Sequence, residues 1–376
     1  MKLSILWRRA VLMALLATGT VQAQDIVVGQ IGPFTVLPAP DAHELNKGTK
    51  AYFAQVNARG GINGRRISFF EVDDKYSPDE FAVQLEQAMA RKPVALLSPV
   101  GSATVQKVLR DKLLDKHDVV ILNAVPGAEV LRDPGHPRLF HVRAGDRQQI
   151  EKIIQHARTL GISRMHVVHQ NIPIGTSGLK VAQDAAASGQ PALEIRGLES
   201  TPEEAALAAA AKQVAGTNSQ AVLVIGSPPF MAHAVAQLRK AGVSQSIFAL
   251  SYVPPGLVVK LAGADAARGV GIARTYPNAM GATLPLHREF SAAMKALDPA
   301  LTAYTSFHLE GYLVARVLVE GLRRSGGDFR PEGLVRGLRA AGEMDFGGFR
   351  VDFSKGNLGS SFIDIGVITS GGRLMY

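Results

Sequence analysis

Short apolar runs alternate along the chain with longer segments of helical periodicity. The strand-like runs are residues 26–32, 67–72, 94–97, 119–122, 139–142, 165–168, 221–225 and 247–250. Between several of them, apolar residues recur three and four positions apart, as in 44–58, 105–113, 150–160 and 231–240. Strands that alternate with helices in this way predict parallel sheets with helices on both faces.

The alternation occurs in two stretches, about 26–137 and 145–268, which predicts two sheet units. The remainder differs, because 306–322 has helical spacing while 349–353 and 362–368 are strand-like. These tail segments can pack on either unit.

Two helix starts carry capping signatures. Ser77-Pro78-Asp79-Glu80 offers a serine N-cap, a proline at the first helical position and a glutamate three residues after the cap. Thr201-Pro202-Glu203-Glu204 repeats the pattern before an alanine-rich segment. Both are predicted to begin helices.

The first 23 residues have the features of a secretory signal peptide. Lys2, Arg8 and Arg9 precede an apolar run from Ala10 to Gly19, and Val21-Gln22-Ala23 supplies small residues for cleavage after Ala23. The alternative is a first buried helix. We expect the mature chain to be periplasmic and not inserted in the membrane, because no later apolar segment approaches about 20 residues.

Composition excludes several classes of function. The chain has no Cys, which excludes disulfides, cysteine-ligated metal sites and a cysteine nucleophile. Its 41 Lys and Arg against 32 Asp and Glu give a net charge of +9, and no run of basic residues exceeds two. Charge spread in this way does not indicate a nucleic-acid partner.

No catalytic or cofactor motif stands out. Gly29-Gln30-Ile31-Gly32-Pro33 lacks the third glycine of a dinucleotide fingerprint, and no P-loop, HExxH, GxSxG or EF-hand spacing occurs. His166 and His169, three apart on a predicted strand, should point to opposite faces, so we expect ordinary histidines and no metal. We therefore expect neither a cofactor nor an enzyme.

The segment Ser98–Thr104 joins a predicted strand to a predicted helix. Gly101 allows close approach, and Ser102 and Thr104 can present hydroxyl and backbone N–H groups to an anionic or polar ligand. The alternative is plain N-capping by Ser102. The two readings are compatible.

One motif resembles a known family. Gly48–Arg65, with the turn "VNARGGINGR", is similar to branched-chain amino-acid (Leu/Ile/Val) substrate-binding proteins of ABC transporters. Further similarities are Val72-Asp73-Asp74, Gly101–Thr104, Phe140–Ala144, Leu160–Ile162 and Glu310-Gly311-Tyr312. The resemblance covers essentially the whole mature chain.

The resemblance implies a fold, an α/β type I periplasmic binding protein. Two doubly wound parallel-sheet lobes would be joined by three hinge crossovers near 141–145, 270–276 and 347–352. Lobe one would hold 25–142 and 274–348, and lobe two 145–270 and 353–376.

The resemblance also implies a ligand site between the lobes. The ligand-binding residues it suggests are Phe34, Ser102, Ala103, Thr104, Asn123, Ala124, Val125, Ile174, Phe230 and Tyr252. In amino-acid-binding members an acidic residue receives the ammonium, whereas the matching position, Ser251-Tyr252, has no acid. A buried ammonium without a counter-charge is costly. A partly apolar or aromatic carboxylate would suit Phe34, Ile174, Phe230 and Tyr252 better.

Three functions follow as hypotheses. A solute receptor would capture a small polar or carboxylate solute by lobe closure and deliver it to an ABC-transporter permease. A sensor subunit of a signalling system would share the fold and bind without turnover. A secreted α/β enzyme is the third, for which the sequence shows no nucleophile, base or metal cluster.

Overall fold

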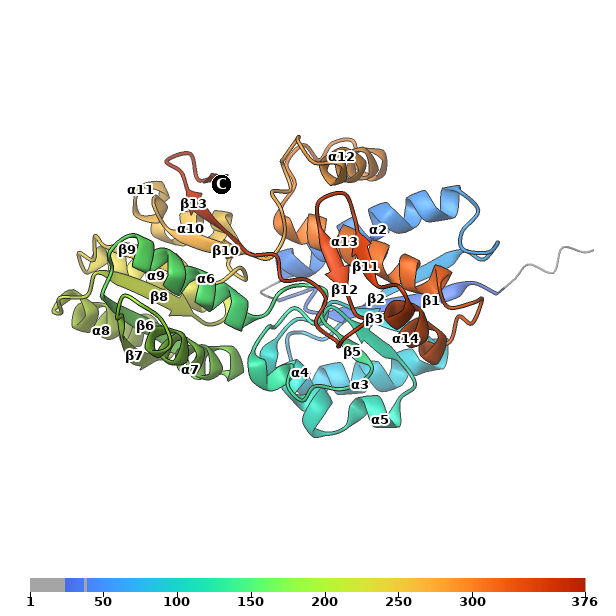
Figure 1. Cartoon of the computed structure of the whole chain (residues 1–376), viewed down its shortest axis with the longest axis horizontal. Coiled ribbons are helices and arrows are strands. Elements are labelled where there is room, and N and C mark those ends of the chain that lie inside the picture. Colours follow the sequence, from blue (N-terminus) through green and yellow to red (C-terminus); the bar gives the residue numbers. More distant parts are fainter. Residues whose placement is uncertain (1–23, 37–38, 376) are drawn as a thin grey trace, which may run out of the picture.

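The computed structural model describes residues 24–36 and 39–375, so the predicted signal peptide, 1–23, lies outside the described residues. Two sheets lie in separate halves of the molecule (Figure 1). The first sheet is entirely parallel, in the order β2–β1–β3–β4–β5. Its strands are β1 (Ile26–Gly32), β2 (Ile67–Asp73), β3 (Ala95–Leu97), β4 (Val120–Leu122) and β5 (Leu139–Phe140).

The second sheet has the order β14–β13–β10–β9–β8–β6–β7. Its strands are β6 (Arg164–Gln170), β7 (Glu194–Ser200), β8 (Ala221–Ile225), β9 (Ser246–Ala249), β10 (Gly271–Arg274), β13 (Asp364–Ile368) and β14 (Leu374–Met375). β13 and β14 pair antiparallel, so this sheet is parallel only from β7 to β10. The C-terminal strands thus complete the second sheet.

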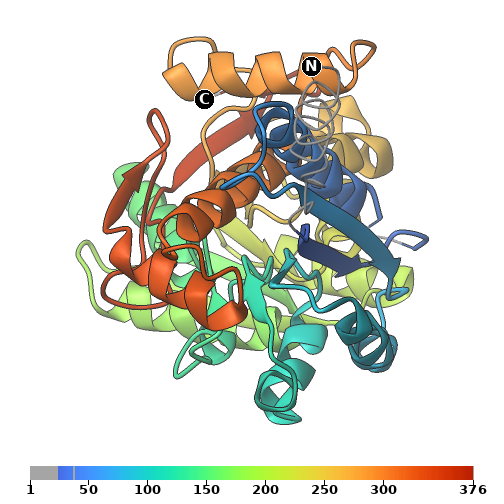
Figure 2. The ribbon, with the colours of Figure 1, turned by 90° about the vertical axis from the view of Figure 1, so that its right-hand side faces the viewer.

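Helices cover both sheets. Those of the first half are α2 (Ala39–Ala58), α3 (Pro78–Ala88), α4 (Ser102–Arg110), α5 (Leu113–Lys116), α12 (Pro285–Leu297), α13 (Ser306–Arg323) and α14 (Pro331–Ala340), with short 3₁₀ turns η1 (Met89–Arg91) and η2 (Glu129–Leu131). Those of the second half are α6 (Asp146–Thr159), α7 (Pro173–Ala187), α8 (Glu204–Ala215), α9 (Pro228–Lys240), α10 (Pro255–Ala262) and α11 (Ala264–Ala267). In Figure 2, α12 lies across the top of the first half, where it packs on α2. No helix among the described residues is both long and apolar enough to cross a bilayer.

The chain passes between the halves three times. It leaves the first sheet after β5, returns after β10 to build α12–α14, and leaves again after the hairpin of β11 (Glu343–Asp345) and β12 (Arg350–Asp352). The type I two-lobed fold is therefore confirmed. The third crossover is predicted at 347–352. This segment contains β12, which still pairs with β11, so the passage to the second half begins after Asp352.

Two local predictions need correction. The signature Thr201–Glu204 does not cap α8, which begins at Glu204 after an N-cap, Glu203, whose side chain makes no capping bond. The helical period around Val105–Leu113 is split into α4 and α5, because Lys112 adopts a left-handed φ of 53°. By contrast, Ser77 caps α3 as predicted, accepting a bond from the Glu80 N–H.

The turn that carries the family resemblance has a physical basis. Gly60, Gly61 and Gly64 have φ between 77° and 90°, in the left-handed region that favours glycine. Asn57 closes the turn, because its side chain accepts from the Ile67 N–H at 2.8 Å and donates to the Ile67 carbonyl at 2.9 Å. The motif therefore joins α2 to β2 in a fixed register.

Glycines also permit the close crossing of α2 and α13. A Cβ on Gly48 would lie 1.9 Å from the His308 carbonyl oxygen, and one on Gly311 would lie 1.9 Å from the Leu45 carbonyl oxygen. Thr49 donates to the Gly311 carbonyl across the same contact at 3.1 Å. The backbones meet here directly, which is why two glycines of the family-like motifs are required.

Candidate functional site

A cavity lies where the two halves meet, at the carboxyl ends of their strands. The loops after β1–β4 contribute Asp41, Tyr76, Val100, Gly101, Ser102, Val125 and Pro126. The loops after β6, β8 and β9 contribute Ile174, Ser227, Pro228 and Tyr252, and α13 contributes Phe307. Strand ends are where open parallel sheets bind ligands.

The cavity is small, with a free volume of about 30 Å³. Sites for small organic ligands are roughly ten times larger. A solute can therefore enter only if the loops of the two halves move apart. The structure has the geometry of a cleft that is nearly shut.

The residues suggested by the resemblance occupy different places. Ser102, Val125, Ile174 and Tyr252 line the cavity. The other six do not line it: Phe34 packs its ring on His43, Ala103 is exposed, and four are buried, namely Thr104, Asn123, Ala124 and Phe230. Roles in binding for these ten residues stay predictions.

Ser102 is not the N-cap of α4, contrary to the capping alternative. Gly101 is the N-cap, with a φ of 104°, and no side chain caps the helix. Ser102 is the first helical residue and lines the cavity. Because the first N–H groups of a helix have no partner within it, this end can donate to a polar or anionic group.

A hydrogen-bonded chain links the halves beside the cavity. The Gly127 N–H, after β4, donates to the Tyr252 hydroxyl, after β9, at 2.8 Å. That hydroxyl in turn donates to the Asp146 carboxylate at the start of α6. Burial raises the pKa of Asp146 to about 6, although the Tyr252 bond and the charges of Arg132 and Arg143 oppose the shift. The Tyr252 hydroxyl thus connects a loop of the first half to the second half.

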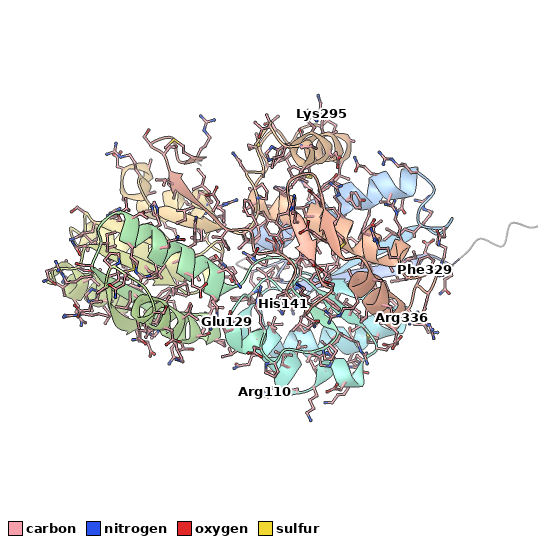
Figure 3. The ribbon with its side chains drawn as sticks, viewed as in Figure 1. Arg110, Glu129, His141, Lys295, Phe329 and Arg336 are labelled. Carbon is pink, nitrogen blue, oxygen red and sulfur yellow. The ribbon has the colours of Figure 1, made fainter. Side chains whose placement is uncertain are left out.

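Two further contacts join the halves. Glu129 of η2 binds Arg147 of α6 at 2.9 Å, and Figure 3 labels Glu129 at this junction. The Arg143 guanidinium donates to the Ser251 hydroxyl, and it lies 4.9 Å from the centre of the Tyr252 ring. The closed arrangement is held by polar contacts that an opening motion can break and reform.

A buried ion pair lies next to Tyr252, a residue of the cavity lining. Arg143 and Glu310 lie 3.3 Å apart, with side chains 1% and 2% exposed. Asn123 donates to Glu310 at 2.8 Å and accepts from the Arg143 backbone N–H at 3.1 Å. Asn123 therefore positions the pair.

Sequence reasoning missed several lining residues. Tyr76 and Ser227 follow strands β2 and β8, so systematic inspection of strand ends would have found them. Asp41 lies eight residues after Pro33, at the start of α2, and so outside the strand-end segment Gly29–Pro33. Phe307 comes from the tail, and no local signal marks it.

The histidines are not assembled as metal ligands. Within residues 24–36 and 39–375, no three His, Asp or Glu side chains lie close enough to hold a metal ion. His166 and His169 are buried in β6, and burial lowers the pKa of each. His141, labelled in Figure 3, is buried where the chain leaves the first sheet.

Two sheets, three passages and a cleft at the strand ends define a type I periplasmic binding protein. The profile of the family described as "Periplasmic binding protein" matches residues 25–372. The chain belongs to this family.

Similar proteins agree with that assignment. A solved extracellular ligand-binding receptor from Verminephrobacter eiseniae is 50% identical, with a TM-score of 0.91, covering 94% of this chain and 100% of that one. A substrate-binding periplasmic protein from Ralstonia solanacearum is 28% identical, with a TM-score of 0.83, covering 93% and 99%. A Leu/Ile/Val-binding protein homolog 2 from Brucella abortus is 36% identical over 69 residues, which are 18% of this chain and 19% of that protein. The match to the Brucella protein therefore spans about a fifth of that relative's length.

Proposed function

We propose that this protein is a periplasmic solute receptor that captures a small polar or carboxylate solute and delivers it to an ABC-transporter permease. The observation that carries the proposal is the cavity lined from both halves. A solute held there contacts both halves at once, so its binding energy favours the closed state.

The lining supports a solute with polar and apolar parts. Ser102 and the start of α4 offer donors to a carboxylate or another polar group. Val125, Ile174 and Phe307 offer apolar walls. An amino-acid-like solute or an aliphatic or aromatic acid has this combination, and binding requires no chemical step.

Native mass spectrometry of gently purified mature protein tests the receptor function. We expect a population heavier than the mature chain by the mass of one small solute, which is released unchanged on denaturation. Its mature mass also tests cleavage after Ala23. Conversion of the released solute by fresh protein would instead identify an enzyme.

The contact of Tyr252 with Gly127 predicts a measurable change in opening. Replacing Tyr252 with Phe removes the hydroxyl that accepts from the Gly127 N–H. We expect the Gly127 amide to exchange hydrogen about five- to tenfold faster, because one net hydrogen bond between the halves is lost. Hydrogen-exchange mass spectrometry of the free protein measures this rate.

Tyr304→Phe is the matched control. Tyr304 is half-buried, and its hydroxyl forms no hydrogen bond with a described residue. Equal exchange at Gly127 in both variants would show that the Tyr252 bond does not hold the halves together.

A further inference from the structure

Asp41 is an acidic residue of the cavity that has no partner among the described residues. It lies in the first turn of α2, lines the cavity and is only 4% exposed. It forms neither a hydrogen bond nor an ion pair with another described residue. Buried carboxylates are usually paired, because an isolated buried charge is costly.

The nearby cations are already engaged. Arg143 is the positive charge that acts on Asp41, but it is bound to Glu310 at 3.3 Å. Lys47, one turn beyond Glu44 on α2, is bound to Asp298 at 2.7 Å. Asp41 is therefore an acidic group at the wall of the cavity without a cation of its own among the described residues.

The groups around Asp41 are mostly acidic, which makes its charged form less favourable still. The titratable and charged groups that face Asp41 are Glu44 of its own helix, Glu310 of α13, Arg143 and Tyr76. Burial first, and then Glu44 and Glu310, raise the pKa of Asp41 well above its usual value, while Arg143 opposes the shift. A cation beside Asp41 would reverse this effect.

We propose that the solute carries a protonated nitrogen, which the Asp41 carboxylate receives when the cleft closes. This inference rests on the proposed receptor function and narrows its solute class. The acid that is lacking at Ser251-Tyr252 in the second half is then supplied from α2 in the first half. Asp41 and Ser102 would then hold opposite ends of a zwitterion.

Matched compounds test the nitrogen. Leucine, phenylalanine and 4-aminobutyrate are each compared with their N-acetyl and deamino counterparts, by thermal shift and calorimetry on the mature protein. We expect binding only by members with a free ammonium. Binding of a deamino acid as tight as that of its amino parent overturns the inference and leaves the receptor function intact.

Asp41→Asn tests the residue, with Glu44→Gln as its control. Glu44 lies on the same helix but bonds to Thr305 and does not line the cavity. We expect D41N to weaken binding of the ammonium compound about 100-fold, as for the loss of one partner of a buried charge pair, and E44Q to change it less than threefold. Unchanged affinity of D41N overturns the inference.

Without solute, the D41N variant should also melt at a higher temperature than the wild-type protein near pH 7. An acid whose folded pKa is raised destabilises the fold as pH rises from its unfolded pKa to its folded pKa, and the amide removes this loss. This gain separates a binding role from a structural one, because removing a structural side chain would lower the melting temperature.

The solute that the purified protein retains distinguishes failure of this inference from failure of the receptor function. A bound solute with a basic nitrogen supports the inference. A bound solute without one overturns it while the receptor function stands. A silent compound panel together with no retained solute counts against the receptor function, and the inference fails with it.

Discussion

Replacing Arg143 with Met is expected to lower the free energy of unfolding by about 3–5 kcal/mol. The substitution leaves the Glu310 carboxylate buried without its cation, since both side chains are almost fully covered. Urea denaturation of residues 24–376, followed by far-UV circular dichroism, measures the change.

The loss should depend on pH. Burial raises the pKa of Glu310, and Arg143 is the charge that most opposes the shift. Without Arg143 the carboxyl group is protonated at a higher pH, and a protonated carboxyl needs no counter-charge. The deficit of R143M is therefore expected to be smaller near pH 5 than near pH 8.

Arg138→Met is the control for this prediction. Arg138 pairs with Asp118 at 3.1 Å, but the side chains are 29% and 57% exposed. Exposed pairs contribute about 1 kcal/mol or less. If R143M lost no more stability than R138M, the buried pair would contribute no more to folding than an exposed one.

Replacing Gly311 with Ala is expected to cost about 3 kcal/mol or to prevent accumulation of folded protein. The new methyl group would meet the Leu45 carbonyl oxygen at 1.9 Å, and a backbone atom cannot rotate away as a side chain can. Overpacking of this kind typically costs about 1–3 kcal/mol and occasionally more. Thermal and urea denaturation measure it.

Two companion variants make this result decisive. Gly48→Ala affects the same helix crossing from α2, and it should be destabilising to a similar extent, which shows that the loss does not arise from the neighbouring Glu310. Gly256→Ala, in α10, meets no atom within 4 Å. It should be neutral or stabilising by up to about 1 kcal/mol, because alanine favours helix. Destabilisation by G256A equal to that by G311A would contradict the close crossing.

Local patterns predicted most elements because their signals are local. The residues of β1 and β8 match the apolar runs, and Ser77 caps α3 as its spacing indicates. Thr201–Glu204 failed because the same residue types also suit a turn before the helix, and only packing decides where α8 begins. The tail strands could not be assigned to a sheet from their own residues.

The site was predictable where it follows strand ends and not otherwise. Ser102, Val125, Ile174 and Tyr252 come directly after strands and line the cavity. Asp41 comes after a longer connection, and Phe307 belongs to a helix that returns from the second half. No periodicity indicates which distant loops the strand order brings together.

The amino-acid sequence by itself determined the alternation of strands and helices, the two-sheet class and the turn after α2, because these depend on residues close together in the chain. Only the tertiary structure decided that Arg143 meets Glu310, 167 positions away, and that Asp41 reaches the cavity with no partner in the part of the chain that the structure describes. Such contacts depend on how three chain passages bring the halves together, and that geometry is set by packing over the whole molecule.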